Sequence, residues 1–348
     1  MQMDKIKVGI IGSLSFIAEK HIEALKNLES DFDFYGVCDL DENRIRDQAF
    51  KYEIPFWTDY KEMLEYSEID LYVVAVPNHL HRKIGQDVAK AGKDALIEKP
   101  ITTNLRDADK LIKIFKKKKR NLFVMLQMRF HPALCMVKQA IDEGKLGRIL
   151  GSSLNIFWFR SGEYFQKSTW KGVKKLEGGS LLNQGIHYID IMQWLVGPVE
   201  SVFARIFTLF HKIETEDTVQ AILKFKNPAG ESGIYSGAGG ASGTLNFNIF
   251  TYPKNFECSL TIFGTQGTIK IGGEKMQEIK FWDVKNYPMP PIKKTAYILQ
   301  TYVYADIAQS LRRGLRAEID GGEARKSLEI IEAIYRSAKE NKEIRFPL

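Results

Sequence analysis

The sequence predicts an α/β protein of two domains: a doubly wound parallel sheet, followed by an α+β domain with a large, mostly antiparallel sheet. Three observations support this prediction. Short apolar runs alternate with amphipathic helical stretches up to residue 126, and alternation of apolar and polar residues dominates after Gly147. The length of 348 residues is that of about two ordinary domains.

The first domain is predicted from apolar strands separated by amphipathic helices. We expect its strands at residues 6–11, 34–38, 70–76, 95–97 and 122–126. We expect its helices at residues 18–28, 42–51, 80–91 and 105–118. This order indicates a parallel sheet covered on both faces, and right-handed crossovers give it the Rossmann topology. We place the domain at residues 1–127.

The second domain, residues 128–348, is predicted mainly from period-two alternation. We expect half-buried strands at residues 219–225, 245–250, 260–263 and 268–271. Residues 227–230 form a turn sequence. Helices are expected at residues 181–195, 297–312 and 324–341, and the last of these can pack back on the first domain.

Composition excludes several classes of protein. A hydrophobic content of 44% excludes a disordered chain, and a net charge of +7 is only mildly basic. The densest basic run, residues 116–120, ends an amphipathic helix and contains no aromatic residue, so we expect no nucleic-acid partner. Cys38, Cys135 and Cys258 lie too far apart in sequence for a metal site or a disulfide framework, and we expect reduced core thiols.

The sequence carries no sign of export or of a membrane span. No apolar signal-peptide segment follows the first residues. The longest apolar stretch, residues 71–76, is far too short to cross a bilayer. We therefore expect a cytoplasmic protein that binds neither a membrane nor a metal.

The first strand leads into a turn at Gly12 that is typical of nucleotide sites. A tight turn between a strand and a helix lets backbone N–H groups hold a pyrophosphate. The usual G-x-G-x-x-G pattern is incomplete here, because Ser13 and Ser15 stand in for the later glycines. A plain strand-to-helix turn is the alternative.

Asp39 ends the second strand, 27 residues after Gly12. A carboxylate there accepts hydrogen bonds from the adenosine ribose hydroxyls and repels a 2′-phosphate, which favours NAD over NADP. Arg44 is the nearby cation that would reverse this preference. The alternative role of Asp39 is to cap a helix.

Two more strand ends carry candidate residues. Pro77, Asn78 and His81 follow the third strand, and Glu98 and Lys99 end the fourth. Ligands of parallel sheets bind at the carboxyl ends of the strands. Lys99 can donate to a substrate hydroxyl and stabilise an alkoxide that develops during hydride transfer. The alternatives are a packing role for His81 and a surface role for Lys99.

A predicted helix of the second domain carries four candidate residues on one face. Asn183, His187, Asp190 and Trp194 are separated by steps of four, three and four. Histidine titrates near neutral pH, so His187 suits a general base. Taken alone, His187 would be read as a core histidine.

These segments together resemble the Gfo/Idh/MocA family of NAD(P)-dependent sugar oxidoreductases. The matching pieces are the Gly12 turn with Ile17, Ala18 and His21, the Pro77–His81 segment, Glu98-Lys99-Pro100, Asn183-x-Gly185-x-His187, residues 263–268, residues 323–325 and residues 334–338. The resemblance implies NAD as the cofactor. The implied cofactor-binding residues are Gly12, Ser13, Ser15, Phe16, Ile17, Asp39, Pro77, Asn78, His81, Glu98 and Lys99.

A narrower resemblance is to UDP-N-acetylglucosaminuronate 3-dehydrogenases within this family. It covers the turn at residues 15–21, the stretch 126–131 and the segment 164–172, in which Thr169 is inserted. The resemblance implies oxidation of the 3-hydroxyl of a UDP-linked amino-sugar uronic acid to a 3-keto sugar, with formation of NADH. Such enzymes serve the synthesis of O-antigen sugars.

The resemblance also implies catalytic roles. Lys99 and His187 would flank the reacting hydroxyl, with His187 taking its proton. Asn183 departs from the aspartate that is common in the wider family. An amide can orient the substrate or the histidine but cannot hold an imidazolium by charge, so we expect His187 to act as a neutral base.

Candidate substrate-binding residues come from the stretch 126–131, the segment 164–172 and the predicted helix that carries Asn183 and His187. Arg129, Tyr164 and Lys171 are candidates for binding a carboxylate or phosphate, Trp170 can stack on a ring, and Asn183 and His187 complete the set. Packing roles for the arginine, tyrosine and tryptophan and a solvated lysine are the alternatives.

Other functions remain open at this stage. A second candidate is a relative acting on another sugar, an inositol or a polyol, and a third is a non-catalytic NAD sensor. The small-residue stretch 237–243 offers a surface for close approach of another subunit, so we expect a homo-oligomer, a dimer or tetramer.

Overall fold

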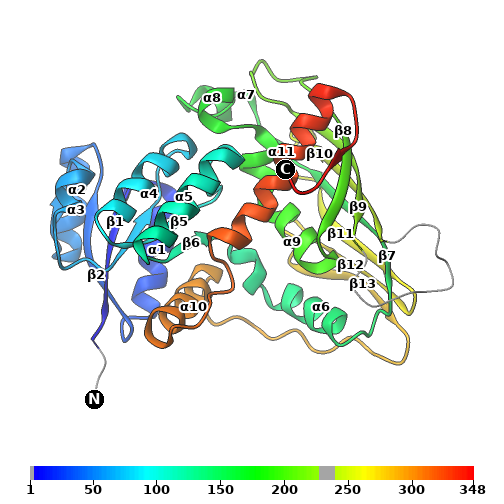
Figure 1. Ribbon diagram of the computed structural model, residues 1–348, viewed down its shortest axis with the longest axis horizontal. Coiled ribbons are helices and arrows are strands. Elements are labelled where there is room, and N and C mark those ends of the chain that lie inside the picture. The colour runs from blue at the N-terminus through cyan, green and yellow to red at the C-terminus, as the bar shows by residue number, and fades with distance from the viewer. Residues whose placement is uncertain (1–3, 227–239) are drawn as a thin grey trace. The chain divides into compact units, whose positions relative to one another are not determined.

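The computed structural model describes residues 4–226 and 240–348, and it divides the chain into two compact units (Figure 1). The first unit comprises residues 1–127 and 295–325, and the second comprises residues 128–294 and 326–348. This division differs from the predicted span 128–348 in assigning residues 295–325 to the first unit. The turn predicted at 227–230 and most of the stretch 237–243 lie outside the described residues.

The first unit contains the predicted parallel sheet. Its strands are β1 (Ile6–Ile11), β2 (Phe32–Cys38), β3 (Phe56–Trp57), β4 (Leu71–Val74), β5 (Asp94–Glu98) and β6 (Leu122–Met125). The order across the sheet is β3-β2-β1-β4-β5-β6, and every pairing is parallel. The doubly wound topology is thus confirmed. The strand order reverses between β1 and β4, where sheets of this type bind their ligands.

Helices cover both faces of this sheet. They are α1 (Phe16–Asn27), α2 (Glu42–Tyr52), α3 (Tyr60–Leu64), the short η1 (Asn78–Leu80), α4 (His81–Lys90), α5 (Leu105–Lys118) and α10 (Leu299–Arg313). Helices α4 and α5 pack together, and so do α1 and α10 (Figure 1). Ser15, Asp41 and Asn104 cap α1, α2 and α5 through their side chains, as N-cap residues do.

The second unit contains the predicted large, mostly antiparallel sheet, which has eight strands in the described residues. Its strands are β7 (Ile149–Phe157), β8 (Val199–Phe207), β9 (Thr218–Phe225), β10 (Ser242–Asn248), β11 (Glu257–Gly264), β12 (Gly267–Gly272), β13 (Glu278–Val284) and β14 (Ile344–Arg345). The order is β13-β12-β11-β7-β10-β9-β8-β14, and only the pairing of β7 with β10 is parallel.

The remaining helical segments surround the candidate residues of the second unit. They are η2 (Gln127–Phe130), α6 (Pro132–Asp142), α7 (Gly162–Gln166), α8 (Lys174–Glu177), η3 (Leu181–Gly185), α9 (Ile186–Val196) and α11 (Gly321–Glu340). The helix predicted at 181–195 is therefore in two parts. Its first turn, η3, is a π-helix, a form that occurs often at functional sites.

A buried ion pair anchors α9. The Arg129 guanidinium donates from Nε and Nη2 to the two carboxylate oxygens of Asp190, each at 2.8 Å. Both side chains are 1% exposed. Ser327 on α11 adds a third donor to Asp190 at 2.7 Å. One carboxylate thus ties α9 to residues far away on both sides of it in the sequence.

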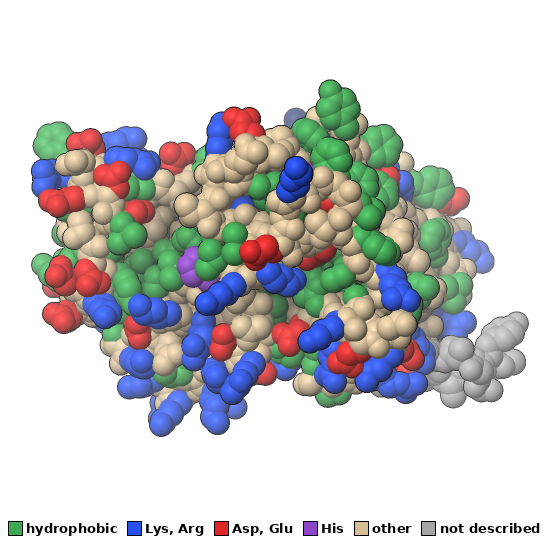
Figure 2. All heavy atoms as spheres, turned by 90° about the horizontal axis from the view of Figure 1, so that it is seen from above, with side chains coloured by type: hydrophobic (Ala, Val, Ile, Leu, Met, Phe, Trp, Pro, Cys, Tyr) green, Lys and Arg blue, Asp and Glu red, His purple; other side chains and the backbone are tan. Residues whose placement is uncertain are grey.

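The surface agrees with the mild net charge. Figure 2 shows Lys and Arg side chains interspersed with Asp and Glu over much of one face. No helix of the described residues has the length and apolar character to cross a bilayer. Cys38 and Cys258 are buried, and burial raises the pKa of Cys38 to about 12. The prediction of a core position for Cys135 is wrong, because its helix α6 turns this side chain outward.

Replacing Asp190 by alanine would test the anchor. The change leaves the Arg129 guanidinium buried without its counter-charge, so the free energy of unfolding should fall by about 3–5 kcal/mol. Urea unfolding measures this loss. Ser327→Ala is the control, because it removes one donor but keeps the ion pair, and it should cost less, about 1.5–3 kcal/mol. Equal stability of Asp190→Ala and the wild type would contradict the anchoring role.

Candidate active site

The turn after β1 is built around Gly12. Its φ of +85° is one that L side chains rarely adopt, and an added Cβ would lie 2.5 Å from the carbonyl oxygen of Ala75. The backbone of Gly12 therefore passes directly against the end of β4. A glycine at this position permits a tight turn between β1 and α1, and such a turn can hold a pyrophosphate through backbone N–H groups.

The two serines of the turn have local partners. Ser13 is fully buried, and its hydroxyl donates to Oε1 of Gln48 at 2.7 Å, while Gln48 donates back to the Ser13 carbonyl. The Ser15 hydroxyl accepts from the Ala18 N–H and caps α1. Both hydroxyls therefore shape the turn, whose helix N-terminus suits an anion. Phe16 is 76% exposed and Ile17 is half-buried.

Asp39 stands where β2 ends, beside the same turn. Its two carboxylate oxygens accept from the backbone N–H groups of Leu14, at 3.0 Å, and Leu40, at 2.7 Å. The residue is half-buried. Because each carboxylate oxygen has two acceptor sites, these bonds are compatible with additional donors such as ribose hydroxyls.

The segment after β4 is fastened by His81. This side chain is 1% exposed, and its Nδ1 and Nε2 lie 2.7 and 2.8 Å from the carbonyl oxygens of Pro100 and Val76. Burial lowers the pKa of His81. A neutral imidazole has one N–H, so His81 can donate to one of these two carbonyls, and it lies between the chain segments that follow β4 and β5. Pro77, which precedes η1, is half-buried, and Asn78 is buried.

Glu98 belongs to a buried chain of hydrogen bonds. Its Oε1 lies 3.0 Å from Nε2 of His21, and Nδ1 of His21 lies 2.9 Å from the Tyr304 hydroxyl. Its Oε2 accepts from the backbone N–H of Lys99 at 3.1 Å. Lys99 itself is half-buried and precedes a cis proline. Glu98 was predicted to bind the cofactor; in the structure its two carboxylate oxygens contact His21 and the Lys99 backbone N–H, so it helps to position Lys99.

In the second unit, Asn183 meets a carboxylate that the sequence analysis missed. Nδ2 of Asn183 donates to Oε1 of Glu177 at 2.8 Å, and the Gly172 N–H donates to Oε2 at 2.7 Å. Glu177 is fully buried. Burial raises the pKa of this carboxyl above its usual value, despite the two N–H donors that lower it. His187 follows in the first turn of α9 and is half-buried.

The predicted substrate segment gathers beside Gln184. Nε and Nη2 of Arg160 donate to Oε1 of Gln184, at 3.2 and 2.9 Å, and Nε2 of Gln184 donates to the Tyr164 hydroxyl at 2.7 Å. Nζ of Lys171 lies 4.0 Å from the centre of the Tyr164 ring and 5.8 Å from that of Trp170. The structure thus brings Tyr164, Trp170 and Lys171 together.

For two arginines, the structure differs from what the sequence predicted. Arg129, a predicted anion binder, is a poor candidate, because its buried guanidinium forms the ion pair with Asp190. Arg160 was not predicted, although its guanidinium donates to Gln184, and burial lowers its pKa. Its only signal in the sequence was its place four residues before Tyr164.

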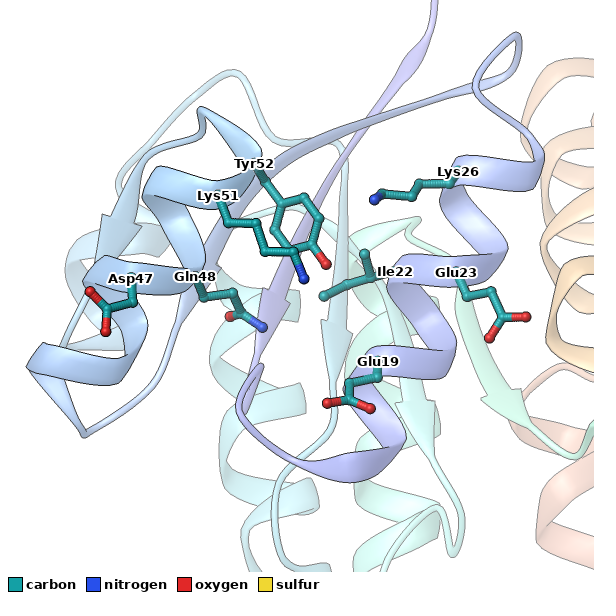
Figure 3. Close-up of a pocket in the computed structure, with 8 residues that line it drawn as sticks. All are labelled: Glu19, Ile22, Glu23, Lys26, Asp47, Gln48, Lys51 and Tyr52. Carbon is teal, nitrogen blue, oxygen red and sulfur yellow. The ribbon is translucent and has the colours of Figure 1, made fainter.

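A cavity of about 610 Å³ opens between α1 and α2 (Figure 3). Its lining residues are Glu19, Ile22, Glu23, Lys26, Asp47, Gln48, Lys51 and Tyr52. The Nζ atoms of Lys26 and Lys51 lie 4.5 and 5.1 Å from the centre of the Tyr52 ring. None of the predicted site residues lines this cavity, although Gln48 also supports the Ser13 turn.

Two family models match most of the chain. The family model described as "Oxidoreductase family, NAD-binding Rossmann fold" matches residues 6–126, and that of the "GFO/IDH/MocA C-terminal domain" matches residues 135–270. Among curated relatives, a myo-inositol 2-dehydrogenase of Thermotoga maritima is 27% identical over 76% of this chain and 74% of its own length. The chain spans 61%, 74% and 60% of the first three curated relatives that it matches.

Two solved structures are similar over nearly the whole chain. The WlbA dehydrogenase from Bordetella pertussis, in complex with NADH and UDP-GlcNAcA, is 34% identical, with a TM-score of 0.90 over 99% of this chain and 100% of its own. The WlbA enzyme from Chromobacterium violaceum is 30% identical, with a TM-score of 0.89 over 100% of this chain and 98% of its own. The fold, both domain models and these relatives together show that the chain belongs to the Gfo/Idh/MocA oxidoreductase family, which has an NAD-binding Rossmann domain.

Proposed function

We propose that this protein is an NAD-dependent dehydrogenase that oxidises the 3-hydroxyl of a UDP-linked N-acetylated amino-sugar uronic acid to the 3-keto sugar. The main support is its likeness to the two WlbA dehydrogenases, which were solved with NADH and UDP-GlcNAcA. The product would serve the synthesis of sugars for a bacterial surface polysaccharide such as O-antigen.

The first unit supplies the groups that would hold NAD. The tight Gly12 turn and the N-terminus of α1 suit the pyrophosphate, and the Asp39 carboxylate suits the adenosine ribose. NAD, when bound, accepts the hydride from the substrate carbon. The carboxylate at 39 also supports NAD over NADP as the preferred cofactor.

Lys99 and His187 are the proposed catalytic residues. Lys99 donates to the reacting oxygen and stabilises the charge that develops there as the hydride leaves. His187 accepts the hydroxyl proton as the general base. The buried chain from Tyr304 through His21 to Glu98 holds the Lys99 backbone N–H and so supports its orientation.

The proposed substrate contacts come from the segment around Tyr164. Lys171 supplies a positive charge for the carboxylate or diphosphate of a nucleotide sugar, and Trp170 supplies an aromatic face. Their gathering with Tyr164 beside Gln184 supports a common role.

A second candidate substrate is an inositol or another sugar without a nucleotide. The curated relatives favour it, because they include the myo-inositol 2-dehydrogenase and a levoglucosan dehydrogenase that is 26% identical. The catalytic assignments to Lys99 and His187 are the same for both substrates.

We also propose a homo-oligomer that forms through the outer face of the large sheet. Strand pairing aligns Phe203, Ile222 and Thr244 in one row on this face, and Ile222 is 63% exposed. A second copy of the chain would cover the exposed apolar side chains of Phe203 and Ile222.

Replacing Lys99 or His187 by alanine should lower kcat by about 100- to 10,000-fold, because each removes a group that acts in the transition state. The assay follows NADH formation from NAD and UDP-N-acetylglucosaminuronate. Lys90→Ala is the control, since Lys90 pairs with Asp87 on the surface. Full activity of His187→Ala would remove the proposed base.

Millimolar UDP should raise the melting temperature, because a ligand that binds only the folded state stabilises it. Differential scanning fluorimetry measures the shift, with myo-inositol at the same concentration as the comparison. A shift with myo-inositol and none with UDP would favour the second candidate.

Light scattering should give the mass of a dimer or tetramer for the wild type and a lower mass for Ile222→Glu. The introduced charge would be buried without a partner at the proposed interface. A monomeric wild type would contradict the oligomer.

A further inference from the structure

The Asn183 amide lies against a carboxylate whose two oxygens are both engaged. Glu177 accepts from the Gly172 N–H through Oε2 and from Nδ2 of Asn183 through Oε1. It is fully buried, whereas Asn183 is 8% exposed. Glu177 therefore joins the end of the predicted substrate segment to the π-helical turn that precedes His187.

The carboxylate fixes which end of the amide faces it. Oε1 of Glu177 accepts from Nδ2 of Asn183 and Oε2 accepts from the Gly172 N–H, so the amide directs its NH₂ group towards Glu177. Because the amide is planar, its carbonyl oxygen Oδ1 is then directed away from Glu177. A neutral partner with both donor and acceptor atoms would not impose this direction.

We propose that Glu177 is a positioning residue for the dehydrogenation: it sets the direction of the Asn183 amide, so that Oδ1 is presented as an acceptor beside His187. The inference rests on the proposed function. His187 lies four residues after Asn183, so both side chains project from the same side of adjoining turns. An acceptor there can orient an imidazole N–H or a substrate hydroxyl.

A neighbouring carboxylate shows what a purely structural role looks like. Glu216 is also buried, and its Oε1 accepts from the Leu181 N–H at 2.7 Å and from the Tyr335 hydroxyl at 2.6 Å. It supports the start of the same π-helical turn, and its described contacts are this backbone N–H, the tyrosine hydroxyl and Lys174. Glu216 is therefore the matched control for Glu177.

Glu177→Gln should reverse the amide while keeping the fold. The oxygen of the introduced glutamine can accept from the Gly172 N–H. Its NH₂ group then faces Asn183, so the Asn183 amide must turn over to offer Oδ1 as the acceptor. The NH₂ group of Asn183 would then occupy the place of Oδ1. We expect kcat with NAD and UDP-N-acetylglucosaminuronate to fall by about 10- to 100-fold, with little change in KM for NAD or in the urea midpoint.

Asn183→Asp supplies the second arm. Alone, this change brings two carboxylates into contact, so both kcat and the urea midpoint should fall. Combined with Glu177→Gln, the introduced glutamine donates to the introduced aspartate, whose other oxygen is again an acceptor. The double variant should recover the midpoint and return kcat to within about fivefold of the wild type, a coupling that distant sites do not show.

The control and the contrary outcomes are distinct. Glu216→Gln should lower the urea midpoint, and adding Asn183→Asp to it should lower kcat further instead of restoring it. Wild-type kcat in Glu177→Gln, or a double variant no better than Asn183→Asp, would overturn the proposal. A wild type that forms no NADH from this substrate would refute the proposed function, whereas the urea midpoints would still decide the pairing of residues 177 and 183.

Discussion

The ion pair between Asp190 and Arg129 is the interaction on which the second domain most depends. It is almost fully buried, and each charge is stable there only because the other is present. Ser327 brings a segment from the end of the chain to the same carboxylate. Helix α9 is thus fixed by groups from two distant parts of the sequence, Arg129 and Ser327. Asn183, in the π-helical turn, and His187, in the first turn of α9, lie just before Asp190 in the chain.

Much of the fold follows from local patterns. The buried strands β1, β4 and β5 are mainly apolar, and their alternation with amphipathic helices predicts the doubly wound order. Shorter or mixed elements gave weaker signals. Strand β3 has only two residues, and β7 carries Gly151, Ser152 and Ser153 in its first half. The π-helical turn at 181–185 has no counterpart in a pattern that assumes one helical period.

The candidate site likewise contains residues that local sequence patterns predict and residues that they do not. Gly12, Asp39 and Lys99 could be found because they end strands, and chain order alone places strand ends at one edge. Glu177, Arg160 and Tyr304 could not, because their roles come from contacts with residues that are not their neighbours in a regular element. Arg129 illustrates the converse error. An arginine in a motif looks like an anion binder until the partner that neutralises it, 61 residues away, is known.

The first domain is assembled from two separate parts of the chain, and this has a consequence for its synthesis. Helix α10 packs against α1 and contributes the Tyr304 hydroxyl to His21, and Arg312 pairs with Asp31. On the ribosome, residues 1–127 emerge first, but these partners follow only after strands β7 to β13 of the second domain have been made. The Rossmann domain therefore completes its core late in translation. Its early strands must remain protected from aggregation until then.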